Sequence, residues 1–251
     1  MSAPDQIRFR LDLAYDGTRF AGMQFLPGVL TVQGEVEQVL GEILNGPVKI
    51  EPASRTDAGV HAAGQVAHLE AATSMAPARL RHALNRLLPD DIRVTGLRVA
   101  RPDFHARFDA TGKEYRYFVH NGRVLPPFLR LYRHHESAPL DLAAMRRAAR
   151  ALVGTHDFAA FTVNPGYDQG DTVRRIDRVA VLRRGEEVEI RVMGGGFLYR
   201  MVRSIAGLLI MVGKGRAAPE LASTLLAGDA RPPEVVTAPA KGLFLWKVSY
   251  T

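Results

Sequence analysis

The sequence has no cysteine among its 251 residues. This absence excludes disulfide bonds, thiolate zinc sites and a cysteine nucleophile, and it is typical of a reducing compartment. Long apolar runs are also missing, since the most apolar stretch, 205–212, is far too short to cross a bilayer. The first residues lack the basic and then apolar segments of a signal peptide. We therefore expect a cytoplasmic protein without a membrane partner.

Lysine is scarce in this chain. Only five of the 33 basic residues are lysines, which leaves 28 arginines, and the formal net charge is +7. The arginine guanidinium makes bidentate hydrogen bonds to phosphates and stacks on nucleobases, so this excess of arginine indicates nucleic acid as a partner. A GC-rich genome would also favour arginine over lysine, but it would not explain the net positive charge. Because no long basic run is present, we expect basic patches on a folded surface.

The two halves of the chain show the same order of predicted elements. The first half is predicted to hold strands at 9–15, 48–53, 65–70 and 92–99, a helix capped by Thr31, and a helix at 77–88; the second half is predicted to hold strands at 115–119, 173–182, 188–192 and 244–250 and helices at 142–152, 197–212 and 219–226. Each half is β-α-β-β-α-β, the order of ferredoxin-like units and of many RNA-binding sheets. We predict an α+β fold of two such halves, 1–103 and 104–251, with largely antiparallel sheets flanked by helices.

Long loops are predicted at 121–139, 164–171 and 228–242. Loops of this length are often functional. Their basic residues are candidates for phosphate contacts, although for any single one of them a solvated surface position is the commoner case: Arg123, Arg130, Arg133 and Lys241.

Two apparent sites are set aside. His134-His135-Glu136 has the residue types of a metal site, but adjacent side chains diverge and no helical His-x-x-x-His is nearby, so we predict no metal. Gly194-Gly195-Gly196 lacks the lysine of a phosphate-binding loop and the spacing of a dinucleotide motif, so a turn is expected.

The segment Ser54-Arg55-Thr56-Asp57-Ala58-Gly59-Val60-His61 carries the main candidate, Asp57. One interpretation is a turn in which the aspartate bonds to a backbone amide and Gly59 takes a left-handed conformation. The other is an acid exposed on a turn for catalysis, with a cation close by in Arg55. Local spacing alone favours the turn.

Several segments together resemble the tRNA pseudouridine synthase A family, in the family's order and over nearly the whole chain. Ser54–His61 is similar to the family's active-site signature. The other similar segments are Tyr15-Asp16-Gly17-Thr18-Arg19-Phe20-Ala21-Gly22-Met23-Gln24, Phe104-His105-Ala106-Arg107, Lys113-Glu114-Tyr115-Arg116-Tyr117, Phe197-Leu198-Tyr199-Arg200-Met201-Val202-Arg203 and Thr237-Ala238-Pro239-Ala240-Lys241-Gly242-Leu243. Met23 departs from the pattern, since many members have tryptophan there, and we expect altered packing at this position.

The resemblance implies the conversion of uridine to pseudouridine in the anticodon stem-loop, at tRNA positions 38, 39 and 40, by a homodimer that needs no cofactor. It implies that Asp57 is the catalytic aspartate, that Arg203 keeps this carboxylate ionised, and that Tyr115 stacks on the uracil and takes the C5 proton. Arg55 would occupy the place of the flipped base, and His61 and Leu243 would contact the substrate. A helical wheel places Arg200, Arg203 and Gly207 opposite the apolar stripe, off the core face.

Two other functions remain open at this point. A catalytically silent tRNA-binding protein with the same sheets would share the charge and the fold. A hydrolase that uses metal or phosphate would depend on the histidines and glycines set aside above.

Overall fold

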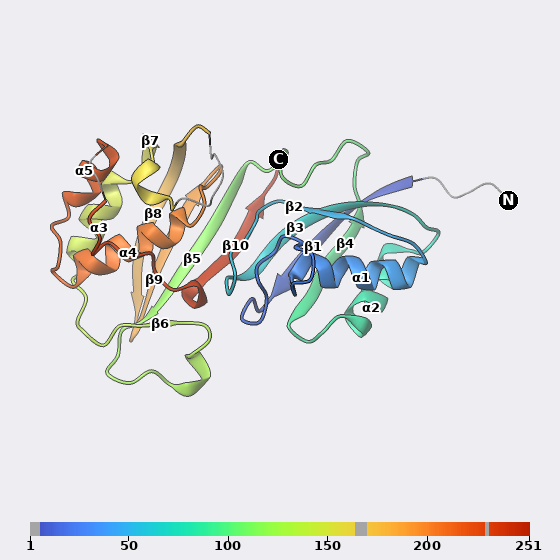
Figure 1. The fold of residues 1–251 in the computed structure, drawn as a ribbon, viewed down its shortest axis with the longest axis horizontal. Helices are drawn as coiled ribbons and strands as arrows, with labels where there is room; N and C mark the ends of the chain where they lie inside the picture. Colours follow the sequence, from blue (N-terminus) through green and yellow to red (C-terminus); the bar gives the residue numbers. More distant parts are fainter. Residues whose placement is uncertain (1–5, 164–169, 229–230) are drawn as a thin grey trace. The chain divides into compact units, whose positions relative to one another are not determined.

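The computed structural model describes residues 6–163, 170–228 and 231–251 (Figure 1). The chain divides into two compact units: unit 1 contains Met1–Thr111 and Leu245–Thr251, and unit 2 contains Gly112–Phe244. Most of the predicted loop 164–171 lies outside the described residues, as do positions 229–230 of the predicted loop 228–242.

Unit 1 is an antiparallel sheet with two helices. It consists of β1 (Gln6–Tyr15), α1 (Val32–Leu44), β2 (Ile50–Pro52), β3 (His61–Ala72), α2 (Pro77–Leu87), β4 (Ile92–Val99) and most of β10 (Leu243–Ser249). The strands lie in the order β4-β1-β3-β10, and β2 also pairs with β3. The pairs β1–β3, β1–β4 and β2–β3 are all antiparallel. The predicted β-α-β-β-α-β order of the first half is confirmed.

The sequence pattern explains how these elements form. Phe9, Leu11 and Leu13 alternate along β1 and are at most 1% exposed, because a strand presents every second side chain to the same face. Thr31 caps α1 as predicted: its hydroxyl oxygen accepts the Gly34 N–H at 3.2 Å, which satisfies one of the free amides at the start of the helix. The α1 and α2 helices contact each other. The core of unit 1 therefore lies between these helices and one face of its sheet.

Unit 2 is a second α+β layer structure (Figure 1). Its elements are β5 (Gly112–His120), the 3₁₀ turn η1 (Pro127–Leu129), β6 (His134–His135), α3 (Leu142–Ala151), β7 (Gly154–Asp157), η2 (Ala159–Phe161), β8 (Val173–Arg184), β9 (Glu187–Gly194), α4 (Met201–Gly213), α5 (Leu221–Leu226) and η3 (Ala240–Gly242). Four strands lie in the order β5-β9-β8-β7, and β6 pairs with β5 in parallel. The short strands β6 and β7 are additions to the predicted order, and the α+β class with largely antiparallel sheets is confirmed.

The late helix begins later than predicted. The sequence predicted a helix from Phe197, but α4 begins at Met201, because Arg200 is left-handed with a φ of 57°. A left-handed residue cannot continue a right-handed helix, so a turn closed by the Met201 N–H, which donates to the Leu198 carbonyl oxygen at 3.1 Å, leads into α4.

The helical wheel placed Arg200, Arg203 and Gly207 off the core face of α4, which left this side open to either a cleft or solvent, and the structure shows it covered at Gly207. Gly207 is buried, and a β-carbon at this position would lie 1.9 Å from the Val236 carbonyl oxygen. The absence of a side chain at Gly207 therefore lets the segment before η3 cross the helix closely. A helical wheel uses only the residues of the helix itself. It therefore cannot show that the segment around Val236, about 30 residues further along the chain, covers this side of α4.

Candidate active site

Asp57 lies in the loop between β2 and β3. The Val60 N–H donates to the Asp57 carbonyl oxygen at 3.1 Å, and Gly59 has a φ of +74°, so residues 57–60 form the turn that the sequence predicted. The side chain of Asp57 is half-buried, whereas Arg55 is exposed. The guanidinium of Arg55 makes no hydrogen bond or ion pair with the described residues of its unit. The turn interpretation is thus correct for the backbone, and Asp57 is only partly buried in it.

Backbone contacts hold this loop against the segment after β1. The Met23 N–H donates to the Thr56 carbonyl oxygen at 3.1 Å, and the Gly59 N–H donates to the Phe20 carbonyl oxygen at 3.2 Å. These two bonds enclose Asp57 on both sides. Met23, the departure from the family pattern, is fully buried. The segments 15–24 and 54–61 therefore form one structural unit around the aspartate.

Two glycines make this close approach feasible. A β-carbon on Gly22 would lie 2.6 Å from the Thr56 carbonyl oxygen, and one on Gly17 would lie 2.0 Å from the Val60 carbonyl oxygen. Neither distance is compatible with a side chain. Both glycines belong to the segment 15–24 that carries the family resemblance, but no local pattern in the sequence indicates these contacts.

A buried hydrogen bond between two hydroxyl groups also fixes the Asp57 loop to β1. The Tyr15 and Thr56 hydroxyl groups are 2.8 Å apart, and both residues are buried. Burial raises the pKa of Tyr15 to about 12, against smaller opposing effects of its hydrogen bonds to Thr56 and Gln65. The phenol therefore stays neutral near pH 7 and its hydrogen bond with Thr56 is retained.

His61 is held inside unit 1. It is 1% exposed, and its Nδ1 atom accepts the Gly17 N–H at 3.0 Å. This contact fixes the ring and links the end of the active-site signature to the segment after β1. Its proposed contact with substrate stays a prediction.

Tyr115 and Arg203 lie in unit 2. Tyr115, on β5, is 5% exposed and meets the Phe197 ring edge-on, with ring centroids 5.2 Å apart. Arg203, in the first turn of α4, is half-buried, and its Nε–H donates to the Ala238 carbonyl oxygen at 2.8 Å. The Ala238 N–H in turn donates to the Arg203 carbonyl oxygen at 3.0 Å. Two of the late family segments are thus joined through Arg203.

The C-terminal segment is packed on β5. The Tyr117 hydroxyl donates to the Pro239 carbonyl oxygen at 3.0 Å, and a β-carbon on Gly242 would lie 2.7 Å from the Tyr117 ring. Burial raises the pKa of Tyr117, while the positive charge of Arg203 acts in the opposite direction. Leu243, which follows Gly242 and begins β10, is 5% exposed. Tyr117 thus contacts the C-terminal segment and lies within the influence of the Arg203 charge, a position that the alternating strand pattern at 115–119 does not reveal.

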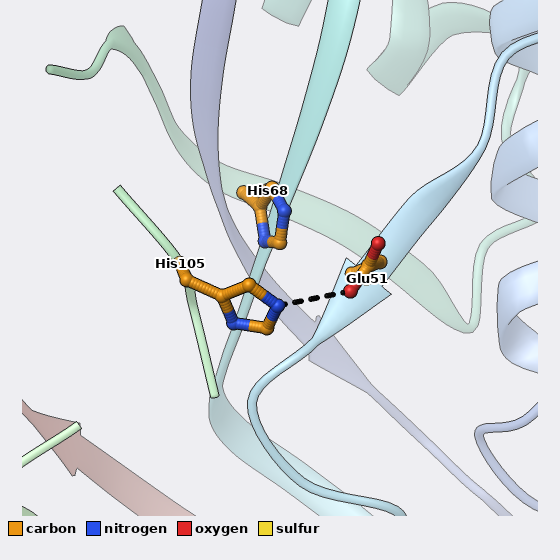
Figure 2. Close-up of side chains that lie close together, drawn as sticks. All are labelled: Glu51, His68 and His105. Carbon is orange, nitrogen blue, oxygen red and sulfur yellow. Dashed lines mark ion pairs between the residues drawn. The ribbon is translucent and has the colours of Figure 1, made fainter. Parts of the chain in front are cut away.

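A cluster of two histidines and a glutamate lies elsewhere in unit 1, at the family's middle segment (Figure 2). Glu51 and His68 are paired across β2 and β3, and His105 Nε2 lies 3.1 Å from a Glu51 carboxylate oxygen. Within the described residues these three are the group whose ligand atoms come close enough to hold a metal.

The ring protons of this cluster argue against metal binding. His68 Nδ1 accepts the Ala106 N–H at 3.2 Å, and His105 Nδ1 accepts the Arg107 N–H at the same distance. A neutral imidazole that accepts at Nδ1 carries its proton at Nε2, and that proton would have to leave before Nε2 could bind a metal. The cluster is better described as a hydrogen-bonded clamp that joins residues 104–107 to the sheet.

The other histidine and glutamate group, at 134–136, also has protein partners. Glu136 accepts a hydrogen bond from the Lys214 ammonium at 2.5 Å, and His135 Nε2 is 3.0 Å from the Gly122 carbonyl oxygen. The carboxylate is therefore neutralised by a lysine.

Comparison with known proteins identifies the class. Residues 148–251 match a family model described as tRNA pseudouridine synthase. The chain is 46% identical to "tRNA pseudouridine synthase A" of Shouchella clausii over 97% of this chain and 93% of that protein, and 43% identical to the protein of the same name from Geobacillus sp. over 97% and 98%. A third such protein, from Syntrophotalea carbinolica, is 43% identical over 96% and 95%. These matches define an isomerase that acts on tRNA.

The chain belongs to the tRNA pseudouridine synthase A family. It forms pseudouridine in tRNA and is accordingly an RNA-binding protein.

Among solved structures, a chain of an archaeal box H/ACA sRNP Nop10-Cbf5 complex matches at 16% identity, over 80% of this chain and 44% of that chain. The TM-score is 0.34, and this likeness is too slight to bear on function. No helix in the described part of the chain is long and apolar enough to span a membrane.

Proposed function

We propose that this enzyme isomerises uridine in the anticodon stem-loop of tRNA, at positions 38, 39 and 40, and that Asp57 is its catalytic carboxylate. The observation that carries the proposal is the loop around Asp57. This loop is bonded on both sides of the aspartate to the segment after β1, and Asp57 is partly buried while Arg55, two residues before it in the chain, is exposed. Such a preorganised side chain loses little by reorganisation when a nucleotide enters.

The reaction requires an anionic oxygen near the ribose. The C1′–N1 bond breaks, a C1′–C5 bond forms, the C5 proton leaves, and N1 of the rotated base takes a proton. Atoms and electrons balance within the nucleotide, so we propose no cofactor and no metal. Asp57 supplies the oxygen, either by adding to C1′ or by removing the C2′ proton.

We assign the remaining roles by the family pattern. Arg203 favours the ionised form of the catalytic aspartate, and Tyr115 stacks on the uracil and accepts the C5 proton. Arg55 takes the stacking place of the flipped nucleotide, for which a planar guanidinium is suited. His61 and Leu243 contact the substrate. In this proposal the halves 1–103 and 104–251 carry the aspartate and the tyrosine–arginine pair, respectively, and two copies of the chain form a homodimer.

Tritium release from tRNA labelled with [5-³H]uridine tests the proposal. Wild-type protein is expected to release tritium without added metal or nucleotide. Asp57→Asn removes the anionic oxygen but keeps the shape, so release should be lost while tRNA affinity stays within about threefold. Asp103→Asn, which changes an exposed aspartate of the same unit, is the matched control and should behave as wild type.

Each alternative predicts a different result in the same assay. A silent RNA-binding protein would retard tRNA in a gel without releasing tritium, and a hydrolase would cleave the RNA only with metal. Turnover by Asp57→Asn at more than about a tenth of the wild-type rate would remove Asp57 from its role. Mapping pseudouridine in the treated tRNA at nucleotide resolution shows whether positions 38, 39 and 40 are the targets, and sedimentation of the protein gives its oligomeric state.

A further inference from the structure

An exposed apolar loop follows the segment that holds the Asp57 loop. Residues 25–30, Phe-Leu-Pro-Gly-Val-Leu, are called the 25–30 loop below. Its four large apolar side chains are each 37–46% exposed: Phe25, Leu26, Val29 and Leu30. A contiguous group of exposed apolar side chains usually marks a contact site.

The 25–30 loop has a defined conformation. The Val29 N–H donates to the Leu26 carbonyl oxygen at 3.2 Å, and Gly28 between them has a φ of +72°, the arrangement of a tight Pro-Gly turn. The Ala21 N–H closes the base of the loop by donating to the Leu30 carbonyl oxygen at 2.9 Å. The apolar side chains are therefore presented by a turn that is already formed, which lowers the entropy cost of binding.

Hydrogen bonds connect this loop to the catalytic aspartate. The Gln33 side-chain oxygen accepts the Phe25 N–H at 2.9 Å, and the Gln33 N–H donates to the Met23 carbonyl oxygen at 3.0 Å. The Met23 N–H in turn donates to the carbonyl oxygen of Thr56, the residue before Asp57. The 25–30 loop is thus a fixed neighbour of the Asp57 loop within unit 1.

Charge and size together indicate the occupant. The Lys49 ammonium lies 4.9 Å from the centroid of the Phe25 ring, and the exposed Arg55 is on the Asp57 loop itself. An exposed aromatic ring with a cation beside it is a combination with which proteins bind unpaired nucleotides, and Lys49 supplies that cation for Phe25. A specific protein interface needs about 20–30 residues on each side, many more than this loop offers.

We propose that the 25–30 loop binds unpaired bases of the tRNA beside the target uridine, with Phe25 stacking on one of them. The inference rests on the proposed role of Asp57, because the location of the target uridine follows from that role. Phe25 is then a substrate-binding residue that holds the nucleotides next to the flipped base.

Binding and turnover of an unmodified tRNA transcript test this proposal. Phe25→Ala should weaken tRNA binding and raise KM by roughly 5- to 150-fold, the range of a lost base stack, with a much smaller change in kcat. Phe25→Tyr keeps the ring and should restore binding to near the wild-type value. Leu87→Ala, at an exposed apolar position at the end of α2, is the control for lost surface area and should have no effect.

The salt dependence of binding separates stacking from charge. Phe25 neutralises no phosphate, so the slope of log affinity against log salt concentration should be the same for Phe25→Ala and wild type. Thermal unfolding of each variant shows whether the fold is retained, and Leu26→Ala provides a second test should Phe25→Ala unfold.

Three results would overturn the proposal. One is tRNA affinity of Phe25→Ala within twofold of wild type, and another is an equal loss in Phe25→Tyr. The third is a weakened self-association of Phe25→Ala with unchanged tRNA affinity, which would assign the loop to a second copy of the chain. Tritium release by Asp57→Asn, together with the expected effect of Phe25→Ala on binding, would instead count against the proposed role of Asp57 alone.

Discussion

The α-carbon of Gly22 lies so close to Thr56 that a β-carbon there would be 2.6 Å from the Thr56 carbonyl oxygen. Gly22 also has a φ of +112°, a conformation that residues with side chains rarely adopt. Thr56 precedes the aspartate, so this contact sets the position of the Asp57 backbone.

Gly22→Ala should therefore impair catalysis with little effect on tRNA binding. The new methyl group must displace Thr56, and a shift of about 1 Å at a reacting group costs on the order of 100-fold in rate. We expect kcat for tritium release to fall by about this factor, with the tRNA dissociation constant changed less than about threefold. Single-turnover tritium release and filter binding measure the two quantities.

Gly185→Ala is the control for backbone strain. Gly185 also has a positive φ, +59°, but nothing lies within 4 Å of its β-carbon position. Through backbone strain, Gly185→Ala and Gly22→Ala should each lower the free energy of unfolding by about 1 kcal/mol. Gly185→Ala should nevertheless leave kcat unchanged. Equal kcat values for the two variants would show that Gly22 does not position Asp57.

The Glu136–Lys214 ion pair in unit 2 should contribute to stability. Its side chains are 11% and 19% exposed, and its atoms are 2.5 Å apart. Lys214→Met leaves a mostly buried carboxylate without its cation, so we expect the free energy of unfolding to fall by about 3 kcal/mol. Urea unfolding at pH 7 measures this loss. Lys49→Met is the matched control, because Lys49 pairs with Glu37 but is 73% exposed, and it should cost at most about 1 kcal/mol.

The pH dependence of that loss gives a second check. Burial opposes ionisation of Glu136, but hydrogen bonds from Lys214 and Ala138 and the lysine charge lower its pKa below the ordinary 4.5. The stabilisation is thus fully present above about pH 4.5 and is lost as the pH falls through the lowered pKa. The difference between wild type and Lys214→Met should shrink in acid; a difference that stays constant from pH 7 to pH 3 would contradict the ion pair as its cause.

Much of the fold could be predicted because its signals are local. The observed strand β4 has the bounds predicted from the sequence, 92–99, and Thr31 caps α1 as expected. Both signals depend only on neighbouring residues. The start of α4 was missed because the left-handed Arg200 gives no compositional signal. The two-residue strand β6 is too short to show a period.

The site was predictable only in part, for the same physical reason. The turn at Asp57 follows from one short segment, whereas the catalytic role of Asp57 rests on the family resemblance and stays a prediction. The contacts of Gly22 with Thr56 and of Gly207 with Val236 join residues about 30 positions apart, and no local rule predicts which backbone will approach a glycine. The clustering of Glu51, His68 and His105 likewise depends on the register of β2 against β3 and on the return of the chain after β4.

His68 should make the stability of the protein depend on pH. Burial lowers its pKa below the ordinary 6.5, and the neighbouring basic groups of His105 and Arg8 act in the same direction, while the carboxylates of Glu51 and Glu70 oppose them. Between the lowered pKa and 6.5 the unfolded chain binds more protons than the folded one, so stability rises with pH. The contribution is complete above about pH 6.5 and is lost progressively below it.

His68→Asn tests this origin. The asparagine side-chain oxygen can still accept the Ala106 N–H in place of Nδ1, so stability at pH 8 should be within about 1 kcal/mol of wild type. Between pH 6.5 and pH 5 the variant should lose less stability than wild type, because its side chain does not titrate; the remaining dependence includes His134, whose pKa burial also lowers. Urea unfolding across this range gives both curves. Parallel curves would mean that His68 is protonated equally in the folded and unfolded states, and the clamp of Figure 2 would then tolerate a charged ring.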